Sequence, residues 1–174
     1  MNQEYTISVF TEDKTGVLAR VLSNFTKRHI NIESINASAS SIPGIYRLII
    51  VVQVSEESII KLVAQLDKQV DVIKAFYYTS KQMVFQEIAM YKVPTKAFMN
   101  GNIVEKITRK HNARILEVEK EFIVIEKTGL HHETEALLEE LRDYGIYEFV
   151  RSGRVAISKP LEQLNTYLNS KKLN

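Results

Sequence analysis

The same order of strands and helices occurs twice along the chain, and this internal repeat limits the folds that the chain can adopt. The first copy predicts strand, helix, strand, strand, helix and strand, at residues 5–10, 18–29, 31–39, 45–54, 55–66 and 70–79. The second copy predicts the same order at residues 82–93, 100–112, 113–119, 122–127, 130–144 and 146–158, the last strand being broken around Ser152 and Gly153. The repeat has a period of about 80 residues and preserves the order of elements rather than residue identity.

Hydrophobic spacing is the basis of these assignments. Apolar and polar residues alternate from Tyr5 to Phe10, which predicts a strand. Apolar residues from Leu18 to Phe25 recur at i, i+3, i+4 and i+7, which predicts an amphipathic helix. Each β-α-β-β-α-β unit is expected to form four antiparallel strands with two helices on one face. We therefore predict an α+β fold of two tandem ferredoxin-like units, with domains at residues 1–80 and 81–160 and a polar tail at 161–174.

The predicted strand Ile45–Val54 is apolar on both sides. Ile50 and its alternate neighbours lie on one face of the strand, and Ile49 and Val51 lie on the other. A strand of this kind should be covered on both faces. The repeat leaves no element over to cover the second face, so another sheet, in this chain or in a second copy, must cover it. We therefore predict a homodimer, or a higher oligomer, formed through the first unit.

Composition excludes several classes of protein. Of the 174 residues, 45% are hydrophobic and 25% are charged, a mixture typical of soluble globular chains. No apolar run approaches the roughly 20 residues that span a bilayer, and the N-terminus lacks the basic and apolar regions of a signal peptide. We therefore expect a cytoplasmic protein without membrane contact. The net charge is only +2 and the basic residues are scattered among acids, so nucleic acid is not an expected partner.

Catalytic and metal-binding residues are not expected. The chain has no cysteine, which excludes disulfides, thiolate metal sites and a cysteine nucleophile. His29 and His111 end predicted helices, where a cation is favourable, and no histidine has a carboxylate at metal-ligand spacing. Phosphate-binding glycine loops and a nucleophile elbow are absent from the sequence. The acidic residues within 117–121 and 133–140 are interpreted as the solvent-facing sides of a strand and a helix.

The segment Asp13–Val21, where the first strand meets the first helix, allows two interpretations. In the first, Asp13 or Thr15 caps the helix and Gly16 permits a tight entry. In the second, free backbone N–H groups and the positive dipole end of the helix bind a carboxylate. Gly16 would then let a ligand approach the backbone closely, while Asp13 and Asn31 would accept hydrogen bonds from an ammonium group. Donors for a carboxylate beside acceptors for an ammonium describe a free α-amino acid.

Four segments carry a resemblance to a known family: Asp13–Val21, Asn31–Ile35, Arg47 and Val150–Gly153. Together they resemble the regulatory, or small, subunit of acetolactate synthase, also called acetohydroxyacid synthase, whose first unit is an amino-acid-binding ACT domain. The resemblance covers about residues 3–160. It implies a subunit without catalytic activity of its own, which binds the catalytic subunit and raises its activity. It also implies feedback inhibition by valine, or by leucine or isoleucine.

The resemblance further implies an effector site between two ACT domains of a dimer, beside the first strand-to-helix loop. By position its residues are Asp13, Gly16, Val17, Leu18, Asn31 and Ile32. The family usually has asparagine at position 13, and the carboxylate of Asp13 should hold an ammonium group but repel the effector carboxylate. No cofactor is implied in this chain, whereas thiamine diphosphate, Mg and FAD are expected on the catalytic subunit.

Two other functions remain open. A free-standing tandem amino-acid sensor would act on another partner, and it would not co-purify with a large thiamine-diphosphate enzyme. A small enzyme built on two ferredoxin-like units would need an acid–base constellation, which the sequence does not display.

Overall fold

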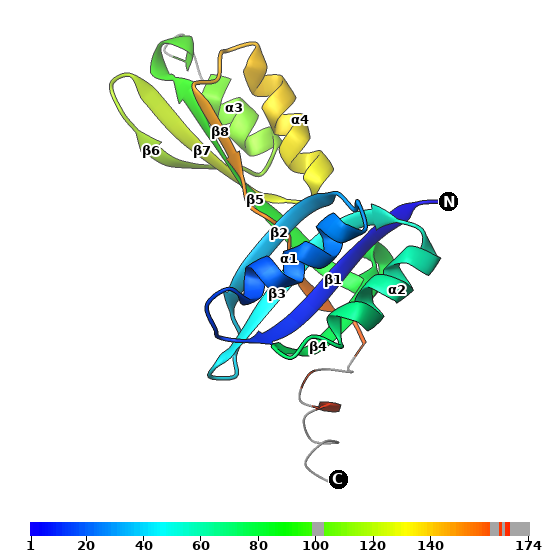
Figure 1. Cartoon of the computed structure of the whole chain (residues 1–174). Coiled ribbons are helices and arrows are strands. Elements are labelled where there is room, and N and C mark those ends of the chain that lie inside the picture. Colours follow the sequence, from blue (N-terminus) through cyan, green and yellow to red (C-terminus); the bar gives the residue numbers. More distant parts are fainter. Residues whose placement is uncertain (99–102, 161–163, 165, 168–174) are drawn as a thin grey trace. The chain divides into compact units, whose positions relative to one another are not determined.

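The first copy of the repeat folds in the predicted order. The computed structural model describes residues 1–98, 103–160, 164, 166 and 167 of the chain (Figure 1). The N-terminal elements are β1 (Gln3–Glu12), α1 (Val17–Lys27), β2 (Ile32–Ala39), β3 (Ile45–Val54), α2 (Glu56–Leu66) and β4 (Val72–Thr79). Together they form the β-α-β-β-α-β arrangement of a ferredoxin-like unit.

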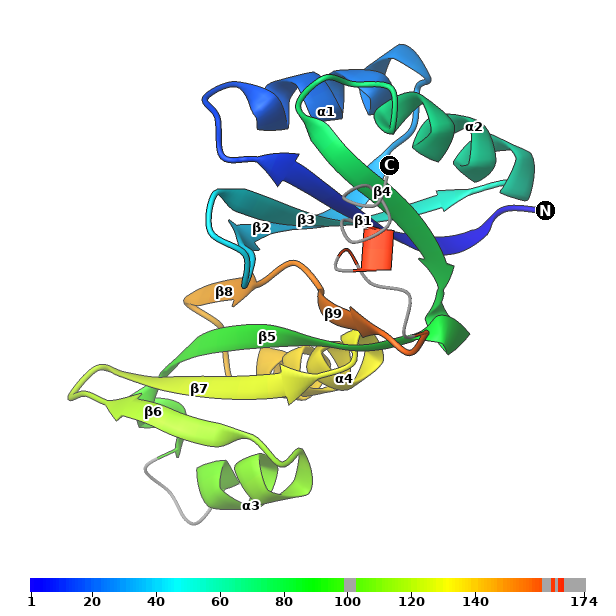
Figure 2. The ribbon, with the colours of Figure 1, turned by 90° about the horizontal axis from the view of Figure 1, so that it is seen from below.

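The sheet of this unit has the order β2-β3-β1-β4, and its neighbouring strands are antiparallel. Helices α1 and α2 cover one face of the sheet, as Figure 2 shows. Alternate residues of β1, among them Ile7 and Val9, are fully buried beneath these helices against Phe25 and Leu62. The period-2 pattern of the strands and the 3.6-residue stripe of the helices therefore meet in one core.

The second copy repeats the arrangement. A short 3-10 turn, η1 (Ser80–Gln82), leads into it, and its further elements are β5 (Met83–Pro94), η2 (Thr95–Phe98), α3 (Ile103–Lys110), β6 (Arg114–Val118), β7 (Phe122–Gly129), α4 (His131–Arg142), β8 (Glu148–Arg151) and β9 (Val155–Ser158). The strand order is β6-β7-β5-β8, and β9 also pairs with β5. Tyr91, Ile125 and Leu141 are fully buried in its core. The α+β prediction of two ferredoxin-like units is thus confirmed; the first residues of the predicted helix 100–112 lie outside the described residues.

The chain divides into two compact units, and the first of them is discontinuous in sequence. It comprises residues 1–84 and 154–174, while the second comprises residues 85–153. Residues from 154 onward join the first unit because Arg154 Nη1 donates to Glu4 Oε1 and Thr6 Oγ1, both at 2.9 Å. The Lys159 N–H also donates to the Gln82 carbonyl at 2.8 Å. The division by sequence pattern, at residues 80 and 160, differs from this grouping at its C-terminal end. Most of the predicted tail, 161–174, lies outside the described residues.

Strand β3 is buried on both faces, as its sequence required. Ile50 is fully buried under the helices, and Ile49 and Val51 on the other face are only 4% and 3% exposed. This burial is complete within one chain, so it does not call for a second copy. The apolar residues on both faces of β3 therefore do not by themselves indicate a homodimer. Among the described helices, none has the length and apolar character to cross a bilayer.

Candidate functional site

The turn between β1 and α1 places a glycine at the start of the helix. Gly16 is the N-cap residue and has φ of 82°, in the left-handed region that favours glycine. No side chain among the described residues caps this helix. The interpretation of Asp13 or Thr15 as a helix cap is therefore wrong, because the left-handed turn at Gly16 lies between them and the first helical amides.

The first turn of α1 leaves backbone donors available. The Val17 N–H donates to the Lys14 carbonyl at 3.3 Å, and the Arg20 N–H donates to the Gly16 carbonyl at 3.1 Å. The amides of Leu18 and Ala19 between them donate to no acceptor in the described part of the chain. Such amides, at the positive end of the helix dipole, favour an anion.

Charged side chains lie around the Gly16 turn, and they leave its backbone accessible. Arg20 lies beside Gly16, since a Cβ placed on the glycine would be 3.1 Å from Arg20 Nη1. The guanidinium of Arg20 is held by Asp71, with an N–O distance of 2.7 Å. Asp13 is exposed, and its N–H donates to the Gly44 carbonyl at 3.0 Å, which ties the loop to the β2–β3 turn. The loop is thus anchored through its backbone and keeps the Asp13 side chain in solvent.

The predicted site residues differ in what they can offer a ligand. Val17 is 4% exposed and belongs to the core, so it can offer its backbone but little side-chain surface. Leu18 is 42% exposed. Asn31 is exposed, and Ile32 is half-buried against the core of the same unit. An apolar ligand group at this loop would therefore contact Leu18 rather than Val17.

Within one chain, Asn31 and Ile32 lie at the opposite end of the sheet from the Gly16 turn. Glu12, at the end of β1, pairs with Ile45, whereas Ile32 pairs with Val52. Ile45 and Val52 are separated by seven residues of β3, which corresponds to about 23 Å at about 3.3 Å per residue. A single chain therefore does not bring the two halves of the predicted site together.

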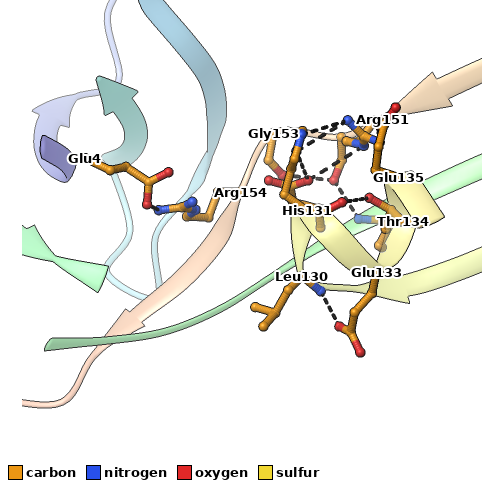
Figure 3. A network of polar contacts seen from close by, with 12 residues as sticks. Glu4, Leu130, His131, Glu133, Thr134, Glu135, Arg151, Gly153 and Arg154 are labelled. Carbon is orange, nitrogen blue, oxygen red and sulfur yellow. Dashed lines mark hydrogen bonds and ion pairs between the residues drawn. The ribbon is translucent and has the colours of Figure 1, made fainter. Parts of the chain in front are cut away.

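The residues Val150–Gly153 take part in a network of polar contacts in the second unit (Figure 3). Arg151 Nη2 donates to Glu135 Oε2 at 2.6 Å, and its guanidinium carbon lies 5.0 Å from the centre of the Phe149 ring. Ser152 follows and exchanges backbone and side-chain hydrogen bonds with Ile88. The segment therefore fastens β8 to β5 and to the helix α4.

Two acidic residues of this network were not identified correctly from sequence. Glu87, in β5, is 5% exposed and lies 3.2 Å from His131 Nδ1 and 3.7 Å from Arg151 Nε. Its only signal in the sequence is one acid within the apolar alternation of residues 82–93. The sequence pattern predicts Glu135 to be a solvated helix residue, whereas in the structure it pairs with Arg151. The described residues contain no group of three or more histidines and acids that could hold a metal ion.

Comparison with known proteins covers both units. A family model described as the AHAS small subunit-like ACT domain matches residues 7–74, and one described as the small subunit of acetolactate synthase matches residues 86–160. The acetolactate synthase small subunit of Mycolicibacterium smegmatis is 38% identical over 155 residues, which cover 89% of this chain and 91% of the relative. The chain belongs to the acetolactate synthase small-subunit family.

Other members of the acetolactate synthase small-subunit family agree with this assignment. The small subunit of Bacillus subtilis is 36% identical over 162 residues, with 90% of this chain and 91% of the relative covered. The crystal structure of the small subunit from Thermotoga maritima matches with a TM-score of 0.83 at 28% identity, covering 91% of this chain and 98% of that one. The first family model includes the Gly16 turn and Asn31, and the second includes the Arg151 network.

The Arg151 network generates a prediction about acid stability. The Arg151 guanidinium holds the pKa of the Glu135 carboxyl below its usual range. A lowered pKa in the folded state stabilises the fold above the unfolded pKa, and this contribution is lost as the pH falls through the folded value. Arg151→Gln should therefore lower the free energy of unfolding by about 1–2 kcal/mol near neutral pH, a value reduced because Glu135 is partly exposed. The loss should shrink towards about pH 3.

Urea titrations at the two pH values measure this difference. Arg142→Gln is the matched control, because Arg142 is 58% exposed and pairs with Glu139 within the same helix. That control should change the unfolding free energy by less than about 0.5 kcal/mol. An equal loss for Arg151→Gln at both pH values would contradict the role assigned to the ion pair.

Proposed function

We propose that the chain is the non-catalytic regulatory subunit of an acetolactate synthase in the cytoplasm. In this role it activates the catalytic subunit and confers feedback inhibition by a branched-chain amino acid, valine first among them. The observation that supports the proposal most is the Gly16 turn within the ACT unit, where exposed helix amides are available to an amino-acid carboxylate. Thiamine diphosphate, Mg and FAD belong, in this proposal, to the catalytic subunit.

The effector site is completed by a second copy of the chain. Strand β2 is at the edge of the first sheet and can pair with β2 of another copy. Both β1 and β2 run antiparallel to β3, so they run in the same direction, and the Gly16 turn lies at the end where β2 finishes. Antiparallel pairing about a twofold axis brings the start of the second β2, with its Asn31, to this end. This geometry supports a homodimer on grounds independent of the apolar strand β3.

The chemistry of the two halves suits an α-amino acid. The Leu18 and Ala19 amides would donate to the carboxylate, and Asn31 of the second copy would accept from the ammonium group. Leu18 and Ile32 would contact the aliphatic side chain. Asp13 would add attraction for the ammonium and repulsion for the carboxylate. A ligand of valine's size, at about 0.7 kcal/mol per non-hydrogen atom, would bind with a dissociation constant of tens of micromolar or weaker.

Feedback inhibition would follow from a population shift. Valine binds one arrangement of the ACT dimer better than another, and the dimer biases the catalytic subunit through that difference. No residue of this chain takes part in the chemical step, so inhibition acts only on the assembled enzyme.

Reconstitution with the catalytic subunit tests the proposed function. The chain alone should convert no pyruvate, the pair should turn over pyruvate faster than the catalytic subunit alone, and valine should inhibit the pair. Turnover by each preparation, with and without valine, leucine or isoleucine, is the measurement. A pair no faster than the catalytic subunit alone would refute the regulatory assignment. Failure of the two proteins to co-purify would favour a sensor of another partner.

Gly16→Asp should reduce valine inhibition and preserve activation. Two like charges about 4 Å apart repel by about 4 kcal/mol at an effective dielectric constant near 20, or close to a thousandfold in affinity. Arg20 Nη1 lies beside the new side chain and offsets part of this repulsion. We therefore expect the valine concentration for half-inhibition to rise by at least about tenfold. Gly16→Ala is the control, since it shares the strain of the left-handed backbone, about 1–2 kcal/mol, without the charge. Undiminished inhibition in a fully activating Gly16→Asp variant would remove Gly16 from the site.

Mixing two variants, each altered in a different half of the site, should restore inhibition by valine if each site spans two copies. Gly16→Asp and Asn31→Ala variants are each expected to be much less sensitive to valine than the unchanged protein when assembled alone. A mixed dimer contains one site with an unchanged Gly16 turn from one copy and an unchanged Asn31 from the other. Unfolded and refolded mixtures, titrated with valine in the reconstituted assay, should recover part of the inhibition. Mixtures as insensitive as the separate variants would indicate that the site does not span the copies as described.

A further inference from the structure

A cavity of about 390 Å³ lies on the face of the first sheet opposite to α1 and α2. Ser8 and Phe10 from β1, Arg47 from β3 and Phe76 from β4 line it, and Leu164 from the C-terminal segment borders it. All its lining residues belong to the first compact unit. None of the predicted effector residues is among them, so the cavity is separate from the site at the Gly16 turn.

Arg47 provides the one positive charge among the described residues that line this cavity. Its Nε donates to Ser8 Oγ at 2.9 Å, and its guanidinium carbon lies 5.4 Å from the centre of the Phe10 ring. No acidic side chain in the described part of the chain pairs with Arg47. Burial lowers the pKa of this guanidinium, as expected for a cation removed from water without a counter-charge. An uncompensated, half-buried guanidinium favours an anion beside it.

Aromatic and aliphatic side chains form much of the cavity lining. Phe10 and Phe76 meet edge to face with ring centres 6.3 Å apart, and Phe76 and Tyr78 stack at 6.4 Å. Leu164, only 4% exposed, adds an aliphatic boundary. Ser38 and Ser41 contribute hydroxyl groups. A few convergent polar groups in a mainly apolar concavity of this size are typical of a small-molecule site.

We propose that this cavity binds a small organic monocarboxylate with an apolar body. Its carboxylate accepts hydrogen bonds from the terminal amino groups of Arg47, which have no partner among the described residues. Its body lies against the rings of Phe10 and Phe76. A single guanidinium, without lysine or a helix N-terminus in the lining, matches one negative charge better than the two charges of a phosphate. The site of this ligand is therefore distinct in place from that of the amino acid.

Benzoate is the probe for this site. Titration of the full-length chain with benzoate, followed by calorimetry and by NMR, should show saturable binding, while the uncharged isostere benzamide and inorganic phosphate should bind much more weakly. Valine should not compete with benzoate. Arg47→Gln should weaken benzoate binding by at least about tenfold, because one charge-assisted pair is lost. Arg28→Gln is the matched control, since Arg28 is an exposed arginine of the same unit that bonds to Gln65 and does not line the cavity.

Three results would overturn the proposal: no saturable benzoate binding, equal binding of benzamide, or unchanged affinity in folded Arg47→Gln. If Arg47→Gln does not fold, NMR of the unchanged protein with benzoate still tests the proposal. Benzoate must then shift the NMR signals of the Arg47 Nε–H and of the Ser8 and Phe76 amides, and leave the Arg28 Nε–H signal in place. Shifts confined to other residues would refute the site.

Discussion

The central strand β1 is buried on both faces, and this constraint sets the role of every alternate residue along it. On the helix side, Ile7 and Val9 need only apolar neighbours. On the other side Thr6 and Ser8 are buried hydroxyls, at 0% and 1% exposure, and each needs a hydrogen-bond partner. Arg154 Nη1 donates a hydrogen bond to Thr6 Oγ1, and Arg47 Nε donates one to Ser8 Oγ, each at 2.9 Å. The side chains of Arg154 and Arg47 therefore both lie across the face of the sheet that carries Thr6 and Ser8. Their positions limit which other groups can pack on this face.

The edges and ends of the same sheet decide where a ligand site can form. The Gly16 turn and Asn31 lie at opposite ends because the β1–β3 and β2–β3 registers place them there. A ligand that contacts both the Gly16 turn and Asn31 must therefore be shared between two copies of the chain. The cavity beside Arg47, in contrast, is formed within one unit and needs no second copy.

The local spacing of apolar residues predicts the order of strands and helices. The features that it does not predict depend on contacts between residues far apart in the sequence. The alternation in β1 and the stripe in α1 depend on residues near one another in sequence, and both were found. The N-cap was misassigned because Asp13 and Thr15 are good capping residues by type, whereas the left-handed conformation of Gly16 is visible only in the folded backbone. The Arg47 cavity was not predicted, because its border includes Leu164, more than a hundred residues from Arg47 in sequence. Glu87 was missed for the same reason: its partners, His131 and Arg151, are on other elements.

The discontinuity of the first unit has a consequence for how this protein can be divided. A cut near residue 80, which the repeat in the sequence suggests, would separate Arg154 from Thr6 and remove the boundary that Leu164 gives to the cavity. The excised fragment would retain its helix-side core but leave the buried hydroxyl of Thr6 without its partner Arg154. A fragment that retains the hydrogen bond between Arg154 and Thr6 must therefore contain residues 1–84 together with the segment that begins at residue 154.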